Sequence, residues 1–216
     1  MTSRIRFASA RQVFETFPAL ADMIAAAPGD ATPLAFARKL ALSERPDDAL
    51  ALLAFLLPRR ESIWWACQGV RAIQGPDDAL VAAEAWVRES DEARRRAAFR
   101  LGESADRKAA STWLALGVWW SGGAIGPIDA PPLIKDRPEI AQPPAHPAPH
   151  MTAAATNAAL ALALAGTGAR REAWIAACVE AGIRFAEGGD ARPKLAPIEA
   201  PAAAASQTGR TANPFA

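Results

Sequence analysis

The first 76 residues of this chain contain six prolines, and five of them stand where a helix can begin. Proline is tolerated in a first helical turn because the first amides of a helix have no intrahelical acceptor. Inside a helix it removes a hydrogen bond and clashes with the preceding turn. This region is therefore expected to form several short helices. The five positions are Pro18, Pro33, Pro46, Pro58 and Pro76.

The spacing of apolar residues between and beyond these prolines predicts an all-α fold. Strand signals are weak, because β-branched residues are sparse, alternation does not persist and the chain has no tyrosine. We expect short helices packed as successive hairpins, like a helical repeat. Ser9 and Thr152 are expected to cap two of them, and residues 4–7 to form a short extended arm. The expected helices cover residues 10–17, 18–27, 33–42, 46–57, 59–73, 77–89, 91–103, 108–120, 153–165 and 169–187.

One short motif occurs twice. The sequence Pro-Asp-Asp-Ala-Leu begins at Pro46 and again at Pro76, and each copy opens a helix that a second helix follows. This pattern is typical of stacked helical hairpins. The similarity ends after these positions and there is no third copy. A common way of starting a helix, with acidic residues near the positive end of the helix dipole, explains the motif as well as a true repeat does.

The composition changes after Trp120. Gly122 and Gly123 end the preceding helix, and eight prolines follow between Pro127 and Pro149. A connection of this length without secondary structure is functional or mobile. Towards the C-terminus the chain is rich in Pro, Ala, Ser and Thr, which predicts disorder. We expect one helical domain over residues 1–188, with a Pro-rich loop over 122–150, and a disordered tail over 189–216.

Charge and cysteine content exclude several classes of protein. The chain has 24 Lys and Arg against 23 Asp and Glu, a net charge of +1, which argues against a strongly basic nucleic-acid binder. Cys67 and Cys178 are too few for a disulfide framework, and their apolar surroundings favour two inert core thiols. No signal-peptide pattern follows Met1, and no apolar run approaches the roughly 18 residues of a membrane helix. We expect a cytoplasmic protein without membrane insertion; the sequence leaves its oligomeric state open.

The segment Arg-Arg-Glu-Ser-Ile-Trp-Trp-Ala-Cys over residues 59–67 is the most distinctive in the chain. On a helix Trp64 and Trp65 point about 100° apart, so both cannot pack on one face. One interpretation is a helix buried on two sides in a bundle. The other is that Trp65 is partly exposed and, with Arg59 and Arg60, binds a partner protein, because Trp and Arg dominate interface hot spots.

A second aromatic group lies in the helix expected over residues 108–120. Trp113, Gly117 and Trp120 fall on one helical face, while Trp119 points elsewhere. Gly117 would let a neighbouring helix approach closely. Core packing explains this pattern. The alternative is an aromatic pocket for a small ligand, although no convergent polar groups accompany it.

The basic run Arg94, Arg95 and Arg96, with Arg100 one turn later, is open to two interpretations. Six basic and four acidic residues lie between positions 91 and 108, which predicts a solvated helix face with local ion pairs. A nucleic-acid surface is the weaker alternative, since the aromatic residues of single-strand binders are missing here.

Metal, cofactor and catalytic motifs are not recognisable. His146 and His150 are separated by prolines that forbid the helix an i, i+4 metal pair would need. His150 could instead fix the start of the helix after Met151. There is no Walker loop, dinucleotide-binding glycine pattern, nucleophile elbow or zinc-protease motif. We expect no metal and no cofactor.

Two motifs carry a resemblance to a family. The motif over residues 59–67 and the sequence Pro-His-Met-Thr-Ala over 149–153, before an alanine-rich helix, resemble an uncharacterised family of small all-helical bacterial proteins met near type VI secretion genes. The resemblance spans roughly residues 5–187. It implies an accessory or interaction role and supplies no catalytic residues.

The leading hypothesis is a non-catalytic adaptor that binds a protein partner, more in keeping with the sequence than an enzyme. The alternative is an enzyme or small-ligand binder that uses the aromatic pocket near Trp113 and Trp120. The Pro-rich loop over 122–150 is included as a contact region. The expected partner-binding residues are Arg59, Arg60, Trp64, Trp65 and His150.

Overall fold

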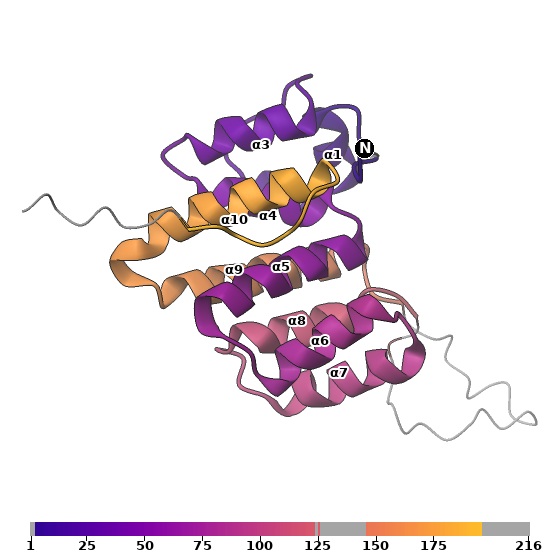
Figure 1. The fold of residues 1–216 in the computed structure, drawn as a ribbon. Helices are drawn as coiled ribbons and strands as arrows, with labels where there is room; N and C mark the ends of the chain where they lie inside the picture. The colour runs from indigo at the N-terminus through magenta and orange to yellow at the C-terminus, as the bar shows by residue number, and fades with distance from the viewer. Residues whose placement is uncertain (1–2, 124, 126–145, 196–216) are drawn as a thin grey trace, which may run out of the picture.

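The computed structural model describes residues 3–123, 125 and 146–195. Within these residues the chain forms ten α-helices and one short 3-10 helix, without strands (Figure 1), so the predicted all-α fold is confirmed. The helices are α1 (Ala10–Thr16), α2 (Leu20–Met23), α3 (Pro33–Ala41), α4 (Asp47–Leu56), α5 (Arg59–Gln74), α6 (Asp78–Arg88), α7 (Glu92–Ser104), α8 (Ala110–Trp119), α9 (Met151–Ala165), η2 (Gly168–Arg170) and α10 (Arg171–Ala186).

The helices are stacked in successive layers. Figure 1 shows α1 and α3 at one end, followed by α4 with α10, then α5 with α9, then α6 with α8, and α7 at the other end. Helix α9 contacts α4, α5, α8 and α10, so it joins layers that are far apart in the sequence. The chain thus returns through the middle of the stack after the Pro-rich loop, which a simple series of hairpins would not do.

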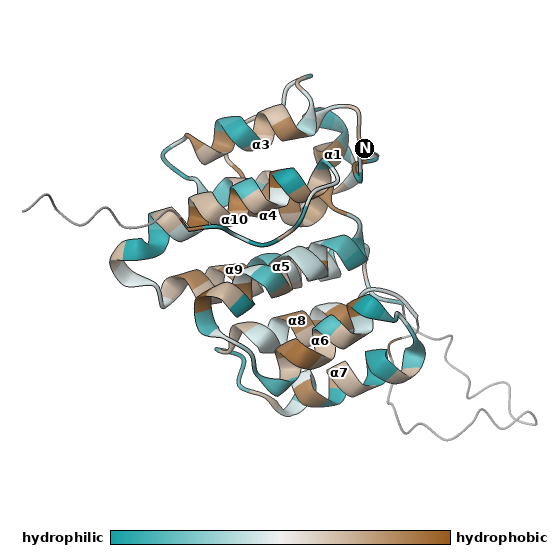
Figure 2. Ribbon diagram, viewed as in Figure 1, coloured by the Kyte–Doolittle hydropathy of each residue, from teal (hydrophilic) through white to brown (hydrophobic). Residues whose placement is uncertain are grey.

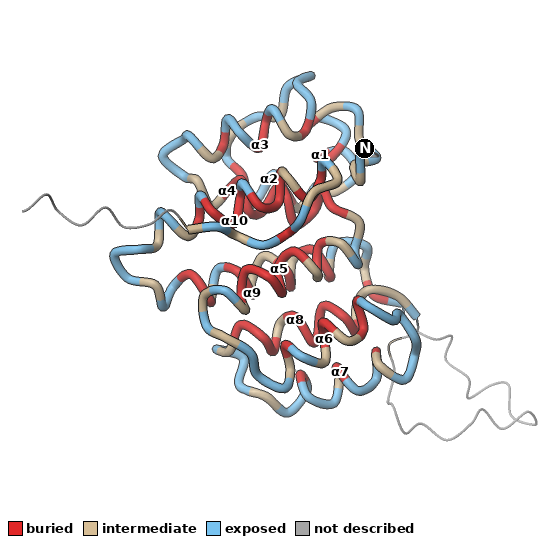
Figure 3. The backbone as a smooth tube through the Cα atoms, in the orientation of Figure 1, coloured by how far each residue is buried: buried red, intermediate tan, exposed pale blue. Residues whose placement is uncertain are grey.

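The core follows the centre of this stack. Every residue of α4 from Asp48 to Leu56 is buried, and α8 is buried over most of its length (Figure 3). Helices α3 and α7 lie at the ends of the stack and bury only one face, and Figure 2 shows hydrophilic residues on both among hydrophobic ones. Hydrophobic burial of this kind is the main favourable contribution to folding.

Most helix starts occur where the sequence predicts them. The Ser9 hydroxyl accepts a hydrogen bond from the Gln12 amide at 3.3 Å and caps α1. Pro33 stands in the first turn of α3, and Pro46 and Pro58 immediately precede α4 and α5. The prolines therefore mark the boundaries because each fixes an N-terminal backbone that needs no amide donor.

Two local expectations were wrong. The helix predicted over residues 18–27 is limited to α2, because Ile24 adopts an extended backbone. Thr152 does not cap α9, which begins at Met151, two residues earlier than expected, with His150 at the N-cap. The Thr152 hydroxyl instead donates to the carbonyl of Gly117 on α8 at 3.4 Å. The Thr152 side chain therefore links α9 to α8 and does not cap α9.

The two copies of the Pro-Asp-Asp-Ala-Leu motif are not equivalent in the structure. In the first copy Pro46 is the N-cap, and Asp47 pairs with Arg171 at 2.5 Å. In the second copy Asp77 is the N-cap, and its carboxylate accepts a bond from the Leu80 amide at 2.8 Å. The helix starts one residue later relative to the motif, which favours a shared helix-start pattern over a true repeat.

The first and last segments of the described part of the chain lie against the helical body. The Arg4 amide donates to the carbonyl of Ala186 at 2.9 Å, beside the end of α10. Residues 189–195, expected to belong to the tail, also lie on the body: Ala191 is buried, and the Arg184 guanidinium donates to the Arg192 carbonyl at 2.7 Å. We call this segment the strap. The rest of the expected tail, and the loop over 126–145, lie outside the described residues.

The two cysteines are free and buried, as predicted. Burial raises the pKa of the Cys178 thiol to about 12 and also raises that of Cys67. A thiol with a raised pKa carries little thiolate at neutral pH and is a poor nucleophile.

No helix in the described part of the chain combines the length and apolarity that crossing a bilayer requires.

Two glycines test how closely the helices are packed. A Cβ added at Gly182 on α10 would lie 2.9 Å from both Leu53 Cδ1 and Trp65 Cε2, whereas one added at Gly117 would meet Ala155 Cβ at 3.4 Å. Gly182→Ala is therefore expected to destabilise the protein by about 1–3 kcal/mol, because overpacking outweighs the better helix propensity of alanine.

Gly117→Ala is the matched control, and we expect it to change the stability by less than about 1 kcal/mol, because the same propensity gain meets an ordinary contact. Urea denaturation of both variants measures this. Equal stabilities for the two variants would contradict the packing described at Gly182.

Candidate functional site

Two surface hollows meet on α5 at Trp64. The first has a volume of about 400 Å³ and the second of about 560 Å³. Trp64 and Phe185 line both, so the hollows form one continuous surface, which we call the basic groove. The first hollow is lined by Arg4, Arg60, Glu61, Trp64, Val87, Arg88 and Phe185, and the second by Trp64, Gln68, Phe185, Gly189, Asp190, Ala191, Arg192 and Lys194.

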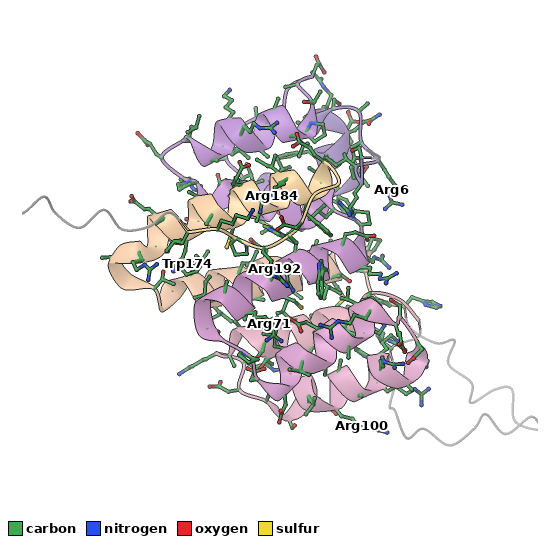
Figure 4. The ribbon with its side chains drawn as sticks, in the orientation of Figure 1. Arg6, Arg71, Arg100, Trp174, Arg184 and Arg192 are labelled. Carbon is green, nitrogen blue, oxygen red and sulfur yellow. The ribbon has the colours of Figure 1, made fainter. Side chains whose placement is uncertain are left out.

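The groove is assembled from segments that are distant in the sequence. Helix α5 supplies Trp64, the end of α6 supplies Arg88, and the end of α10 supplies Phe185. Arg4, near the N-terminus, and the strap complete the groove. Figure 4 shows Arg192 in the middle of the stack, and Arg100 at the end formed by α7. The site therefore lies where the two described ends of the chain meet the central helices.

The groove is more basic than the chain as a whole. Five cationic and two anionic side chains line it, giving a charge of +3, whereas the whole chain carries +1. A concave surface of one sign attracts ligands of the opposite sign. The groove is thus suited to an anionic ligand. Its cations are Arg4, Arg60, Arg88, Arg192 and Lys194, and its anions are Glu61 and Asp190.

Two of the arginines support the groove. The Arg60 guanidinium donates to the carbonyls of Val87 at 2.7 Å and Arg88 at 3.3 Å, and so satisfies acceptors at the end of α6. The Arg4 guanidinium donates to the Phe185 carbonyl, and its carbon lies 4.1 Å from the centre of the Phe185 ring. These bonds hold the walls of the groove together.

The buried carboxylate of Glu84 helps to position Arg88. Glu84 is 3% exposed and accepts two bonds from Arg71, at 2.7 and 2.8 Å. These bonds raise the pKa of Arg71. Arg88 contacts the same carboxylate at 3.5 Å, and its guanidinium carbon lies 5.7 Å from the centre of the Trp64 ring. The Arg88 side chain is 62% exposed, so it remains accessible to a ligand.

The strap brings the remaining cations. Arg192 and Lys194 are exposed, and no described residue gives either side chain a hydrogen bond or an ion pair. Within the strap, the Asp190 carboxylate accepts a hydrogen bond from the Arg192 amide at 2.9 Å, and this bond lowers the pKa of Asp190. Nearby Arg184 and Lys194 lower it further. The bond at Asp190 is made by the Arg192 backbone, so the side chains of Arg192 and Lys194 remain available to a ligand.

The structure brings together only two of the five predicted partner-binding residues. Arg60 and Trp64 line the groove. Arg59 donates to the Ser121 carbonyl at 2.9 Å and lines a different hollow, of about 560 Å³, beside Phe17 and Phe55. His150 is exposed, and its side chain makes no capping bond to α9.

Trp65 is a core residue, which corrects its assignment to a partner-binding surface. It is 1% exposed, and its indole N–H donates to the Cys178 carbonyl on α10 at 3.0 Å. The rotation of about 100° between successive residues turns Trp65 towards α10 when Trp64 faces the groove. The interpretation of α5 as a helix buried on two sides, which the sequence left open, fits this arrangement.

The second aromatic group has a different arrangement. Trp113 and Trp120 are half-buried, and the Trp113 indole donates to the Arg107 carbonyl at 2.8 Å. Neither residue lines the groove or the hollow beside Arg59. Gly117 faces Ala155 of α9, where an added Cβ would make an ordinary contact at 3.4 Å. Trp119 is buried and stacks on Phe99, with ring centres 4.5 Å apart.

The basic run in α7 is paired along its own helix. Glu92 binds Arg95 at 2.6 Å and Arg96 at 2.8 Å, and Asp91 pairs with Arg94. The bond from Arg95 lowers the pKa of Glu92. These are the local ion pairs that the sequence predicts. No group of three or more potential metal-ligating side chains occurs among the described residues.

Sequence reasoning missed Arg88, Phe185, Arg192 and Lys194 as groove residues. Arg88 is an ordinary helix-terminal arginine, and Phe185 follows the apolar pattern of α10. Arg192 and Lys194 lie in a segment whose composition predicts a tail. No pattern in the sequence marks these residues, because only the packing of α5, α6, α10 and the strap brings them together.

Comparison with known families places the chain. A family model described as "Family of unknown function (DUF6931)" matches residues 36–186. The chain belongs to this family. The match includes Trp64, Arg88 and Phe185 of the groove, while Arg4 and the strap of this DUF6931 member lie outside it. The comparisons with curated proteins and with solved structures found no match.

The buried carboxylate of Glu84 gives a stability prediction. Replacing it by alanine leaves Arg71 without its two bonds, and hydrogen bonds to charged groups contribute about 1.5–3 kcal/mol each. Because Arg71 is more than a third exposed, solvent reduces this loss. We expect Glu84→Ala to destabilise the protein by about 1–3 kcal/mol in urea denaturation. Glu103→Ala, an exposed acid on α7, serves as the control. A loss no larger than in this control would contradict the assigned role.

The strap gives a pH prediction. The pKa of Asp190 is lowered in the folded protein, so its bond to the Arg192 amide is present above the unfolded pKa of about 3.9. The bond is lost as the pH falls through the folded pKa. Asp190→Ala, which removes the acceptor at neutral pH, is expected to speed hydrogen exchange in residues 189–195. Asp30→Ala, which removes another exposed ion pair, should leave that exchange unchanged. Unchanged exchange in Asp190→Ala would show that the carboxylate does not order the strap.

Proposed function

We propose that this protein is a non-catalytic adaptor that binds another protein through the basic groove. The observation that carries the proposal is the position of Trp64, half-buried between accessible cations on both sides of the groove. Tryptophan and arginine are the residues that most often dominate protein–protein binding energy. The groove offers both on one concave surface.

The groups in the groove are suited to binding more than to bond-making. Its polar side chains are mainly cations, two of which already donate to backbone carbonyls at the groove wall. The two thiols of the described chain are buried, with pKa values raised by burial. The groove cations can orient and hold an anionic surface. Neither they nor the buried thiols form a nucleophile and base pair of the kind used in covalent catalysis.

The place of such an adaptor in the cell is part of the proposal. The motifs over residues 59–67 and 149–153 resemble proteins met near type VI secretion genes, so a component of that machine is the first partner to test. The family description carries no function, and the link to secretion depends on the resemblance alone. We place the protein in the cytoplasm, and the two unpaired cysteines agree with a reducing compartment.

Quantitative co-purification from the native cell tests the proposal. The wild-type chain and Arg192→Glu are used as bait under identical conditions, and the recovered proteins are compared by mass spectrometry. We expect at least one protein to be depleted by about tenfold or more with Arg192→Glu, because reversing a rim charge weakens both encounter and affinity. The depleted protein is then purified and its direct binding is measured.

Arg100→Glu is the matched control. It makes the same change of charge on an exposed arginine of α7, far from the groove (Figure 4). We expect it to recover the same proteins as the wild type. If no protein distinguishes Arg192→Glu from Arg100→Glu, the groove is not a protein-binding site and the proposal fails.

A further inference from the structure

We propose that the groove recognises an extended acidic segment of the partner, in which an apolar residue is flanked on both sides by carboxylates. The inference rests on the proposed function, since it names the chemistry of the partner at the same groove. It follows from the order of the groups along the groove, from the bonds that these groups already make, and from the two acids that line it.

The order along the groove is cation, aromatic, cation. Arg88 lines only the first hollow, Arg192 and Lys194 line only the second, and Trp64 lies where the two meet. A ligand that follows the groove therefore passes a cation, then an indole ring, then two further cations. A polypeptide matches this order when an acidic residue precedes and another follows an apolar residue.

The cations differ in their availability. Arg4 and Arg60 already donate to the carbonyls of Phe185, Val87 and Arg88. Arg192 and Lys194 are exposed, without an acceptor among the described residues. The 3.5 Å contact of Arg88 with Glu84 is the longest that Glu84 makes with an arginine. Three groove cations are therefore not held by a backbone carbonyl, with Arg88 on one side of Trp64 and the strap pair on the other.

The centre of the groove suits an apolar side chain. Trp64 is half-buried, and Phe185 beside it is covered by the Arg4 guanidinium. An apolar side chain placed on the indole would remove the remaining apolar surface of Trp64 from water, a favourable change of about 25 cal/mol per Å². The flanking cations would at the same time meet carboxylates, with which arginine forms charge-assisted hydrogen bonds. The two contributions reinforce one another in a single segment.

A nucleic acid fits the groove less well. Glu61 and Asp190 lie in the groove, and a backbone with a phosphate at every nucleotide cannot keep its charges away from them, whereas a polypeptide can carry carboxylates only where the cations lie. Proteins that bind nucleic acid through its backbone commonly neutralise about 6–10 phosphates, more than the five cations of the groove can serve. A polypeptide with a few spaced carboxylates avoids this mismatch. An oligonucleotide is therefore an outcome of the test, and not the expected ligand.

Fluorescence anisotropy with synthetic peptides tests the inference. The probe is a labelled peptide in which a phenylalanine is flanked on each side by two glutamates, and it is titrated with the full chain at low salt. We expect saturable binding that weakens as salt is added, because exposed charges are screened. The double variant Arg192→Glu/Lys194→Glu should weaken binding by about tenfold or more. These substitutions keep the backbone groups that hold the strap.

The controls separate charge from position and from the apolar anchor. Arg100→Glu should bind the probe within about twofold of the wild type, since it changes the same charge outside the groove. A peptide with glutamines in place of glutamates, and one with glycine in place of phenylalanine, should each bind at least about tenfold more weakly. Circular dichroism confirms that each variant is folded.

Four results of the anisotropy experiment would overturn the inference. They are failure of the acidic peptide to bind, equal binding of the glutamine peptide, unchanged binding to the strap double variant, and tighter binding of an oligothymidylate of equal charge. None of these decides whether the protein is an adaptor, because the co-purification experiment tests that with native proteins. A native partner that depends on Arg192 but contacts the groove through a segment without acidic residues would leave the adaptor function standing and refute this inference.

Discussion

The contact between Trp65 and Gly182 fixes the distance between α5 and α10, and the groove depends on that distance. The indole of Trp65 comes within 2.9 Å of where a Cβ at Gly182 would lie, and its N–H donates to the carbonyl of Cys178 on the same helix, α10. Trp64 is the next residue on α5, and Phe185 lies almost one turn beyond Gly182 on α10. Because both helices are rigid over these lengths, the buried contact places the two aromatic residues of the groove side by side.

A second buried interaction positions the groove's charge. Glu84 connects α6 to Arg71 of α5 and also contacts Arg88, which lies over Trp64. Taking a carboxylate out of water is costly unless its oxygens are fully bonded, and two arginines supply those bonds here. The arrangement keeps Arg88 near the indole while most of its side chain stays in solvent. The packing of α5 against α10 thus positions Trp64, and the ion pairs of Glu84 on α6 position Arg88 beside it.

Much of the candidate site could not be predicted, for a physical reason. The sequence marks Arg60 and Trp64 as unusual, yet it gives Arg59, Trp65 and His150 the same weight. Helical geometry shows that Trp64 and Trp65 face different ways. Which of them faces the core depends on where α10 lies, and α10 is more than a hundred residues away. The strap shows the same limit. Its composition is that of a tail, and it lies on the body through the bonds of Arg184 to the Arg192 carbonyl and the Asp190 carboxylate and through the burial of Ala191.

By itself, the sequence determined the local structure of this protein: the all-α class, the short helices that begin at prolines and capping side chains, the buried thiols and the ion pairs of α7. Each of these depends on residues a few positions apart, so spacing and residue type are sufficient. The tertiary structure alone decided the return of α9 through the stack, the burial of Trp65, and the groove built by α5, α6, α10 and the strap. Those features depend on contacts between distant segments, and packing selects among many arrangements that the same local pattern allows.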